Sequence, residues 1–202
     1  MPLTPLQLGL DLLDRADHLA QLAGTPNTSI WSVEGDVLRA SWTFVGAAVD
    51  TYFHERVRGA LLNPPLSPSA TKFALPLGSV DDLISGFLEN RAHSRPRVRL
   101  KSLIHDALLK ETFQGSRNVE TAFALMGVKR FWPAISGAMS DPVPDIKSRL
   151  DAQYNRRNRI AHQGDYHRQE RRQKVWYDSL GRTEVDDEVL WTRGFLQAAD
   201  LV

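Results

Sequence analysis

The chain has 202 residues, of which 42% are hydrophobic, and it carries 25 Lys and Arg against 24 Asp and Glu. This length and composition favour one folded domain, or one domain with an appendage, over a disordered chain. Because the sequence has no cysteine, disulfides, thiolate nucleophiles and cysteine-based metal sites are excluded. No charged leader precedes an apolar run, and no stretch approaches the roughly 20 apolar residues of a membrane helix. We therefore expect a cytoplasmic protein without a membrane partner.

The first predicted element is an amphipathic helix. Pro5 suits its first position, Thr4 can cap it, and Gly24 is a typical stop signal. We assign residues 1–29 to this N-terminal helix and turn extension, and residues 30–202 to the main domain.

A long helix is predicted from Val37 to Leu62. Gly46 and the neighbouring alanines would let another helix approach closely, which favours a central place in a bundle. On its polar side, Asp50, His54 and Glu55 fit either an exposed face or a site. The apolar stripe consists of Leu38, Trp42, Val45, Val49 and Phe53.

The remainder of the chain also has helical periodicity. A loop is predicted over Asn63–Ser79, and then short helices over 79–90, 97–113 and 118–127, the last closed by Gly127. The first of them has a capping signal from Ser79 to Asp82, and Pro96 suits a loop and helix start. No segment shows convincing strand alternation, so the predicted fold is all-α.

Two further helices close the chain. One begins near Pro144 and has the repeating positions Ile146, Leu150, Tyr154, Arg157 and Ala161. The other begins with a capping signal from Thr183 to Asp186.

Positive charge is concentrated in residues 156–174. This segment contains seven Arg or Lys residues and two acids, which gives it a net charge of +5. Because the whole chain has a net charge of +1, the remainder carries −4. Such an uneven distribution indicates a polyanionic partner, although solvated loops are commonly basic too.

Arg157 stands out because it lies on the apolar stripe of its helix. It must snorkel, pair with an acid such as Asp50, or face a site or subunit interface. At about 100° per residue, Arg157 and His162 point about 140° apart on a regular helix. If both serve one reaction, the helix must end or distort near His162, or a second copy must complete the site. Gly164, a common helix stop, places His162 in the last turn.

The segment Arg157-Asn158-Arg159-Ile160-Ala161-His162 resembles the signature of HEPN domains, in which a histidine follows an arginine by four to six residues. A polar residue often stands directly after that arginine, as Asn158 does here. The order of helices over residues 30–202 is similar to the RiboL-PSP-HEPN-like branch. This resemblance implies an HEPN-like helical bundle with an extra N-terminal helix, and a homodimer in which two motifs meet at a metal-independent endoribonuclease site.

The resemblance also implies residue roles. His162 would act as general acid or base, Arg157 would stabilise the phosphate, and Asn158 would orient one of them. RNA is the implied substrate, with an antitoxin or defence-system protein as a further partner of a toxin or defence effector. No cofactor is implied. Sequence-independent attraction of the RNA phosphate backbone would come from Arg156, Arg159, Arg168, Arg171, Arg172 and Lys174.

Two further features of HEPN-like and metal-binding proteins can be compared with this sequence. Some HEPN toxins have a tyrosine two residues after the histidine that a partner nucleotidyltransferase modifies with AMP, but this chain has Gly164 there and Tyr166 two residues later. His162 and His167 could hold a metal, yet two histidines without a third ligand are more often surface residues, so we predict no metal.

The competing class is a non-catalytic module that binds nucleotides, RNA or a protein partner. In that case the RNRIAH segment would be a salt-bridged dimer surface.

Overall fold

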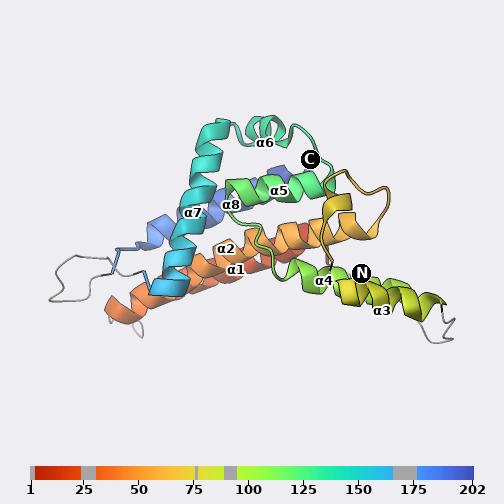
Figure 1. Cartoon of the computed structure of the whole chain (residues 1–202). Coiled ribbons are helices and arrows are strands. Elements are labelled where there is room, and N and C mark those ends of the chain that lie inside the picture. The colour runs from red at the N-terminus through yellow and green to blue at the C-terminus, as the bar shows by residue number, and fades with distance from the viewer. Residues whose placement is uncertain (1–2, 24–30, 76, 89–94, 166–176) are drawn as a thin grey trace, which may run out of the picture. The chain divides into compact units, whose positions relative to one another are not determined.

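The computed structural model describes residues 3–23, 31–75, 77–88, 95–165 and 177–202. Within these ranges the chain is helical and has no β-strand, so the predicted all-α class is confirmed. No helix among them is long and apolar enough to cross a membrane. The α-helices are α1 Pro5–Leu22, α2 Trp31–Leu62, α3 Leu77–Leu88, α4 Pro96–Leu108, α5 Ser116–Met126, α6 Phe131–Met139, α7 Val143–Gln163 and α8 Arg182–Asp200 (Figure 1).

The chain divides into two compact units. Unit 1 contains Met1–Tyr52, Gln114–Arg117 and Arg130–Val202, and unit 2 contains Phe53–Phe113 and Asn118–Lys129. The helices α2 and α5 therefore contribute to both units, while the RNRIAH segment belongs to unit 1.

The core of unit 1 forms where α1, the first part of α2, and α8 pack together. A Cβ at Gly9 of α1 would lie 2.9 Å from the Leu196 side chain and 3.3 Å from the carbonyl oxygen of Ala48. The hydroxyl of Ser41 donates to the Ala16 carbonyl at 2.6 Å. The N-terminal helix is thus built into the core of unit 1.

Unit 2 is organised around aromatic side chains. The rings of Phe53 and Phe123 meet edge to face at 5.3 Å between centroids, a favourable geometry for aromatic pairs. Nε2 of His54 lies 2.9 Å from the Leu108 carbonyl oxygen, and its ring lies 4.8 Å from that of Phe113. His54 therefore has a structural role within unit 2.

Several helix ends confirm the sequence signals. Thr4 and Gln7 form a reciprocal capping box at the start of α1. The helix α4 begins at Pro96. Gly127 and Gly164, which end α5 and α7, have φ of 78° and 62°, a left-handed conformation that glycine adopts without a Cβ penalty.

Other boundaries were predicted wrongly. The helix α2 begins at Trp31, six residues before the predicted Val37, because nearly two turns extend beyond the apolar stripe. The α4 helix ends at Leu108, five residues early. The predicted Asn63–Ser79 loop contains a short 3₁₀ turn, Ala70–Lys72, and the start of α3.

The predicted cap of α8 was also wrong. Thr183 lies inside the helix, and the N-cap is Gly181 without a side-chain hydrogen bond. The capping motif occurs in the sequence, but the helix begins at Arg182, two residues before the start at Glu184 that an N-cap at Thr183 requires.

Candidate functional site

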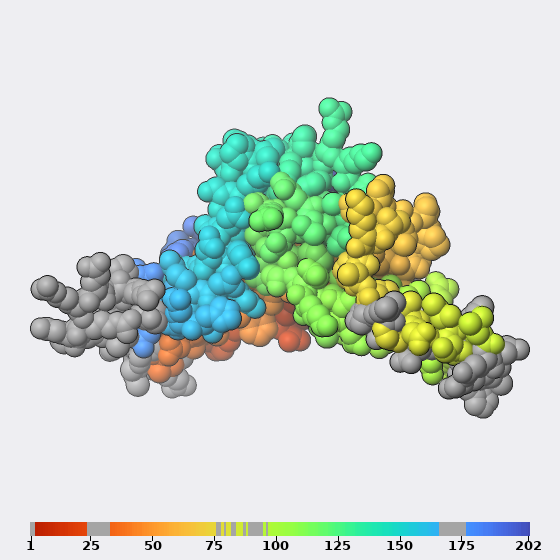
Figure 2. Space-filling model, viewed as in Figure 1, coloured from red at the N-terminus to blue at the C-terminus, as the bar shows by residue number. Residues whose placement is uncertain are grey.

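The motif lies in the last two turns of α7, a regular helix that continues to Gln163. The N–H of Gly164 donates to the Ile160 carbonyl at 3.0 Å, and the N–H of Asp165 donates to the Arg159 carbonyl at 3.2 Å. These bonds satisfy carbonyls that would otherwise lack a partner at the helix end. His162 is exposed in this capped last turn, and the end of α7 forms part of the surface in Figure 2.

Arg157 points toward α2. Its side chain is half-buried, and a Cβ at Gly46 would lie only 3.0 Å from its Cγ. Nη1 donates to Oδ1 of Asn158 at 3.1 Å. Among the described residues no carboxylate pairs with Arg157, so the alternative of a pair with Asp50 is not observed there.

Two buried polar atoms near Gly46 have no hydrogen-bond partner within the described residues. They are Nε of Arg157 and Oε1 of Gln114, whose residue is 2% exposed. That Oε1 atom lies 3.1 Å from the position of a Cβ on Gly46. The lack of a side chain at position 46 therefore makes room for both residues.

Gly46→Ala should disturb this packing. The added methyl would overlap Arg157 and Gln114, so we expect a loss of about 1–3 kcal/mol in the free energy of unfolding. The matched control is Gly59→Ala in the same helix, because nothing lies within 4 Å of a Cβ there. That change should stabilise the protein by up to about 1 kcal/mol through helix propensity. Urea unfolding measures both, and equal effects of the two changes would contradict the close approach.

The two arginines that flank Arg157 are bound to acids. Nη1 of Arg156 lies 2.6 Å from Oε1 of Glu184, and its Nη2 lies 3.1 Å from Oδ2 of Asp165. The same Nη2 donates to the Ser179 carbonyl at 2.7 Å. The guanidinium also lies over the Trp42 ring, 5.5 Å from its centroid. Arg156 is thereby held between α2, α7 and the start of α8.

Asp165 is the centre of this network. Its side chain is 0% exposed, and the carboxylate lies 3.6 Å from Nε of Arg39 and 3.6 Å from Nε of Arg159. Arg159 also pairs with Asp178 at 3.3 Å. We call Asp165, Arg39, Arg156 and Arg159 the Asp165 cluster.

The structure thus gives Arg156, Arg157 and Arg159 different surroundings. Arg156 and Arg159 are neutralised by acids, whereas no acid pairs with Arg157 within the described residues. Sequence reasoning counted Asp165 only as a charge and missed Arg39, Trp42 and Glu184. The available signal was an acid directly after the Gly164 stop, where it can approach cations in the preceding turn of the helix.

A small pocket of about 330 Å³ lies beside the Asp165 cluster. At its edge Oε2 of Glu188 accepts from Nε of Arg149 at 2.9 Å, and Oε1 accepts from Nε2 of Gln153 at 2.8 Å. Burial raises the pKa of Glu188 above its ordinary 4.5, although the Arg149 charge and these hydrogen bonds oppose the shift. The lining residues are Trp42, Arg149, Ala152, Gln153, Asn155, Arg156, Arg159, Glu184 and Glu188.

This shift predicts a pH dependence of stability. Because the folded protein holds the Glu188 proton more tightly than the unfolded chain, its free energy of unfolding should fall as pH rises from about 4.5 through the raised pKa. Glu188→Gln should remove this pH dependence. As pH rises from acidic to neutral, the free energy of unfolding of the variant should therefore increase relative to that of the original protein. The exposed neighbour Asp187, changed to Asn, is the control. Urea unfolding at several pH values tests this, and parallel curves for the original and Glu188→Gln would contradict it.

The predicted RNA-binding residues Arg168, Arg171, Arg172 and Lys174 lie outside the described residues, as do Tyr166 and His167. In unit 2, Arg95, Arg97, Arg99 and Lys101 are exposed around the start of α4, and no ion pair neutralises them within the described part of the chain. Across the described ranges, no three His, Asp or Glu side chains gather as metal ligands.

Comparisons of the chain with protein-family models, with curated proteins and with solved structures give no match.

Proposed function

We propose that this protein is a metal-independent endoribonuclease of the HEPN type, with Arg157 and His162 as its catalytic residues. The observation that carries the proposal is a difference in ion pairing among the arginines at the end of α7. Arg156 and Arg159 are held by acids, while the Arg157 guanidinium has no acid within the described residues and His162 is exposed on the capped end of α7. A guanidinium without a carboxylate partner is suited to a phosphate.

The proposed reaction begins with attack of a ribose 2′-oxygen on the adjacent phosphorus. A neutral His162 accepts the 2′-hydroxyl proton, a bond forms between the 2′-oxygen and phosphorus, and the bond to the 5′-oxygen breaks. The 5′-oxygen takes a proton from a water molecule and leaves as a hydroxyl, and the His162 imidazolium then returns its proton to the solvent. The products are a 2′,3′-cyclic phosphate and a 5′-hydroxyl end.

Arg157 would stabilise the negative charge that develops on the phosphoryl oxygens. Its contact with Oδ1 of Asn158 leaves other guanidinium N–H groups for the substrate. Asn158 would thus orient Arg157 in the site.

The active unit in this proposal is an HEPN-like homodimer. Arg157 packs toward Gly46 of α2, and on a regular helix His162 points about 140° away from it. One chain therefore does not direct both side chains to one point, and an isologous interface supplies the second set.

The four exposed cations around the start of α4 would add sequence-independent attraction for RNA. Arg156 and Arg159 can contribute less attraction for RNA than their formal charges suggest, because acids neutralise them. A role as a toxin or defence effector, controlled by a partner protein, is consistent with this activity and is part of the proposal.

The function is tested with purified protein and mixed single-stranded RNA in EDTA. We expect cleavage under these conditions, with products that end in a 2′,3′-cyclic phosphate or its hydrolysis product. Activity that disappears in EDTA and returns with magnesium would exclude the proposed chemistry.

The divergence of Arg157 and His162 within one chain also favours the second candidate, a non-catalytic interaction module. In that case a change at Arg157 would reduce partner binding or stability and leave no cleavage activity to lose. The absence of RNA cleavage by a folded dimer would favour this module.

A further inference from the structure

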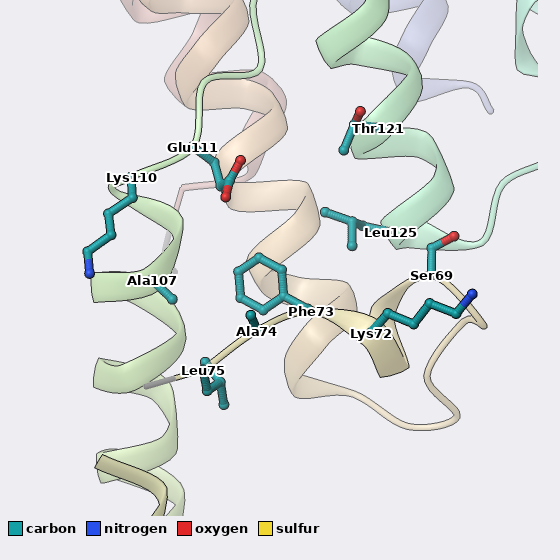
Figure 3. A pocket seen from close by; sticks show the side chains of 10 residues that line it. All are labelled: Ser69, Lys72, Phe73, Ala74, Leu75, Ala107, Lys110, Glu111, Thr121 and Leu125. Carbon is teal, nitrogen blue, oxygen red and sulfur yellow. The ribbon is translucent and has the colours of Figure 1, made fainter. Parts of the chain in front are cut away.

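A second pocket lies wholly within unit 2 and is unrelated to the RNRIAH segment. Its volume is about 550 Å³, within the range of about 300–1,000 Å³ typical of small-molecule sites. The end of α4, the helix α5 and the segment around the 3₁₀ turn enclose it (Figure 3). The lining residues are Ser69, Lys72, Phe73, Ala74, Leu75, Ala107, Lys110, Glu111, Thr121 and Leu125.

The floor of this pocket is apolar and includes one aromatic ring. Ala107 and Leu125 are buried, while the Phe73 ring is only half-buried and lies in the middle of the lining in Figure 3. An accessible ring over an apolar floor favours a flat ligand that can stack on it.

Three exposed charged side chains surround this floor: Lys72, Lys110 and Glu111. None of them forms an ion pair within the described residues. In Figure 3 Glu111 extends into the space above the Phe73 ring, and the two lysines lie on opposite sides of it. The pocket therefore presents a hydrogen-bond acceptor near its centre and cations at its periphery.

These charges restrict the ligand. A carboxylate accepts hydrogen bonds from N–H donors, and an ammonium attracts an anion. A simple fatty acid would bring no donor to Glu111, and an apolar amine would bring no anion to the lysines. The donors and the anion must also lie at opposite ends of the ligand, because the lysines lie away from Glu111.

We propose that this pocket binds a flat heteroaromatic anion whose ring edge carries N–H donors and whose other end carries an acid group. The ring would stack on Phe73, the N–H edge would face Glu111, and the acid group would lie near Lys72 or Lys110. The net charge of these three side chains, +1, suits such an anion. The inference goes beyond the proposed RNA cleavage and does not depend on it.

The test is calorimetric titration of the full chain at low ionic strength, with guanosine 5′-monophosphate as the probe. Its base carries two neighbouring N–H donor groups, and its phosphate supplies the anion. Guanosine lacks the phosphate, and 2-naphthoate keeps a flat ring and an acid group but lacks N–H donors. We expect the nucleotide to bind about tenfold or more tightly than either comparison ligand, since each lost charge-assisted contact corresponds to about that factor.

Substitutions assign these contacts to residues. Glu111→Gln should remove the advantage of the nucleotide over 2-naphthoate, and the pair Lys72→Ala with Lys110→Ala should remove its advantage over guanosine. All three positions are exposed, so the variants should fold normally. Matched controls are Asp106→Asn and Lys129→Ala, exposed residues of unit 2 outside the pocket, which should leave the affinities unchanged.

Two results would overturn the proposal. One is the absence of saturable nucleotide binding at millimolar concentration. The other is nucleotide binding that neither Glu111→Gln nor the lysine pair weakens, which would place the ligand elsewhere.

Discussion

His162→Ala and Arg157→Ala should each reduce RNA cleavage by on the order of 10²-fold or more, and an equal mixture of the two inactive proteins should recover part of the activity. The losses follow from removing the proton-transfer group and the stabilisation of phosphoryl charge. The recovery follows because Arg157 and His162 of one chain point in different directions. In the proposed dimer, each site therefore combines Arg157 of one chain with His162 of the other.

The size of the recovery can be estimated. If subunits exchange freely, half of the dimers in the mixture are heterodimers. In each of these, one site has lost both residues and the other site is intact. Cleavage should therefore return to about a quarter of the original rate in a symmetric dimer. If both residues of a site came from the same chain, no site in any dimer would be intact and mixing would restore nothing.

Two controls accompany this experiment. His105→Ala removes another exposed helical histidine, in unit 2, and should leave cleavage unchanged. Thermal unfolding of each variant separates loss of chemistry from loss of fold. A His162→Ala protein that melts normally and still cleaves at the original rate would remove His162 from the mechanism.

The second large effect is expected at Asp165. Asp165→Asn should lower the free energy of unfolding by about 3–5 kcal/mol, the cost typical of removing one partner from a buried ion pair. The Arg39 and Arg156 side chains are only 12% and 13% exposed, so they would lose a carboxylate where water compensates poorly. Asparagine retains the size of the side chain and tolerates the left-handed φ of 57° at this position, so the change isolates the charge.

A surface pair provides the contrast. Asp11 and Arg15 form an ion pair at 3.0 Å with both side chains more than half exposed, and Asp11→Asn should cost no more than about 0.5 kcal/mol. Urea unfolding near neutral pH compares the two variants. Equal stabilities would show that the Asp165 cluster does not hold the end of α7.

The sequence by itself determined the all-α class and most helix positions. Its signals are local: the Thr4 cap of α1, the proline that begins α4, and the glycines after α5 and α7. The stripe from Leu38 to Phe53 was likewise correctly predicted as core, because burial of one helix face follows from spacing alone. Local signals failed where a helix extends beyond its apolar stripe, as at Trp31.

Only the tertiary structure decided what each arginine of residues 156–159 contacts. Arg156 and Arg157 are adjacent in sequence, but one helical step directs the first toward Asp165 and Glu184 and the second toward Gly46. The acids lie 9 and 28 residues away from Arg156 in the chain. Counting charges along the sequence assigned residues 156–174 a net charge of +5 without indicating which arginines the acids neutralise. The folded chain brings distant acids to two of its arginines and none, within the described residues, to Arg157, because ion pairing depends on distance in space and not on distance along the sequence.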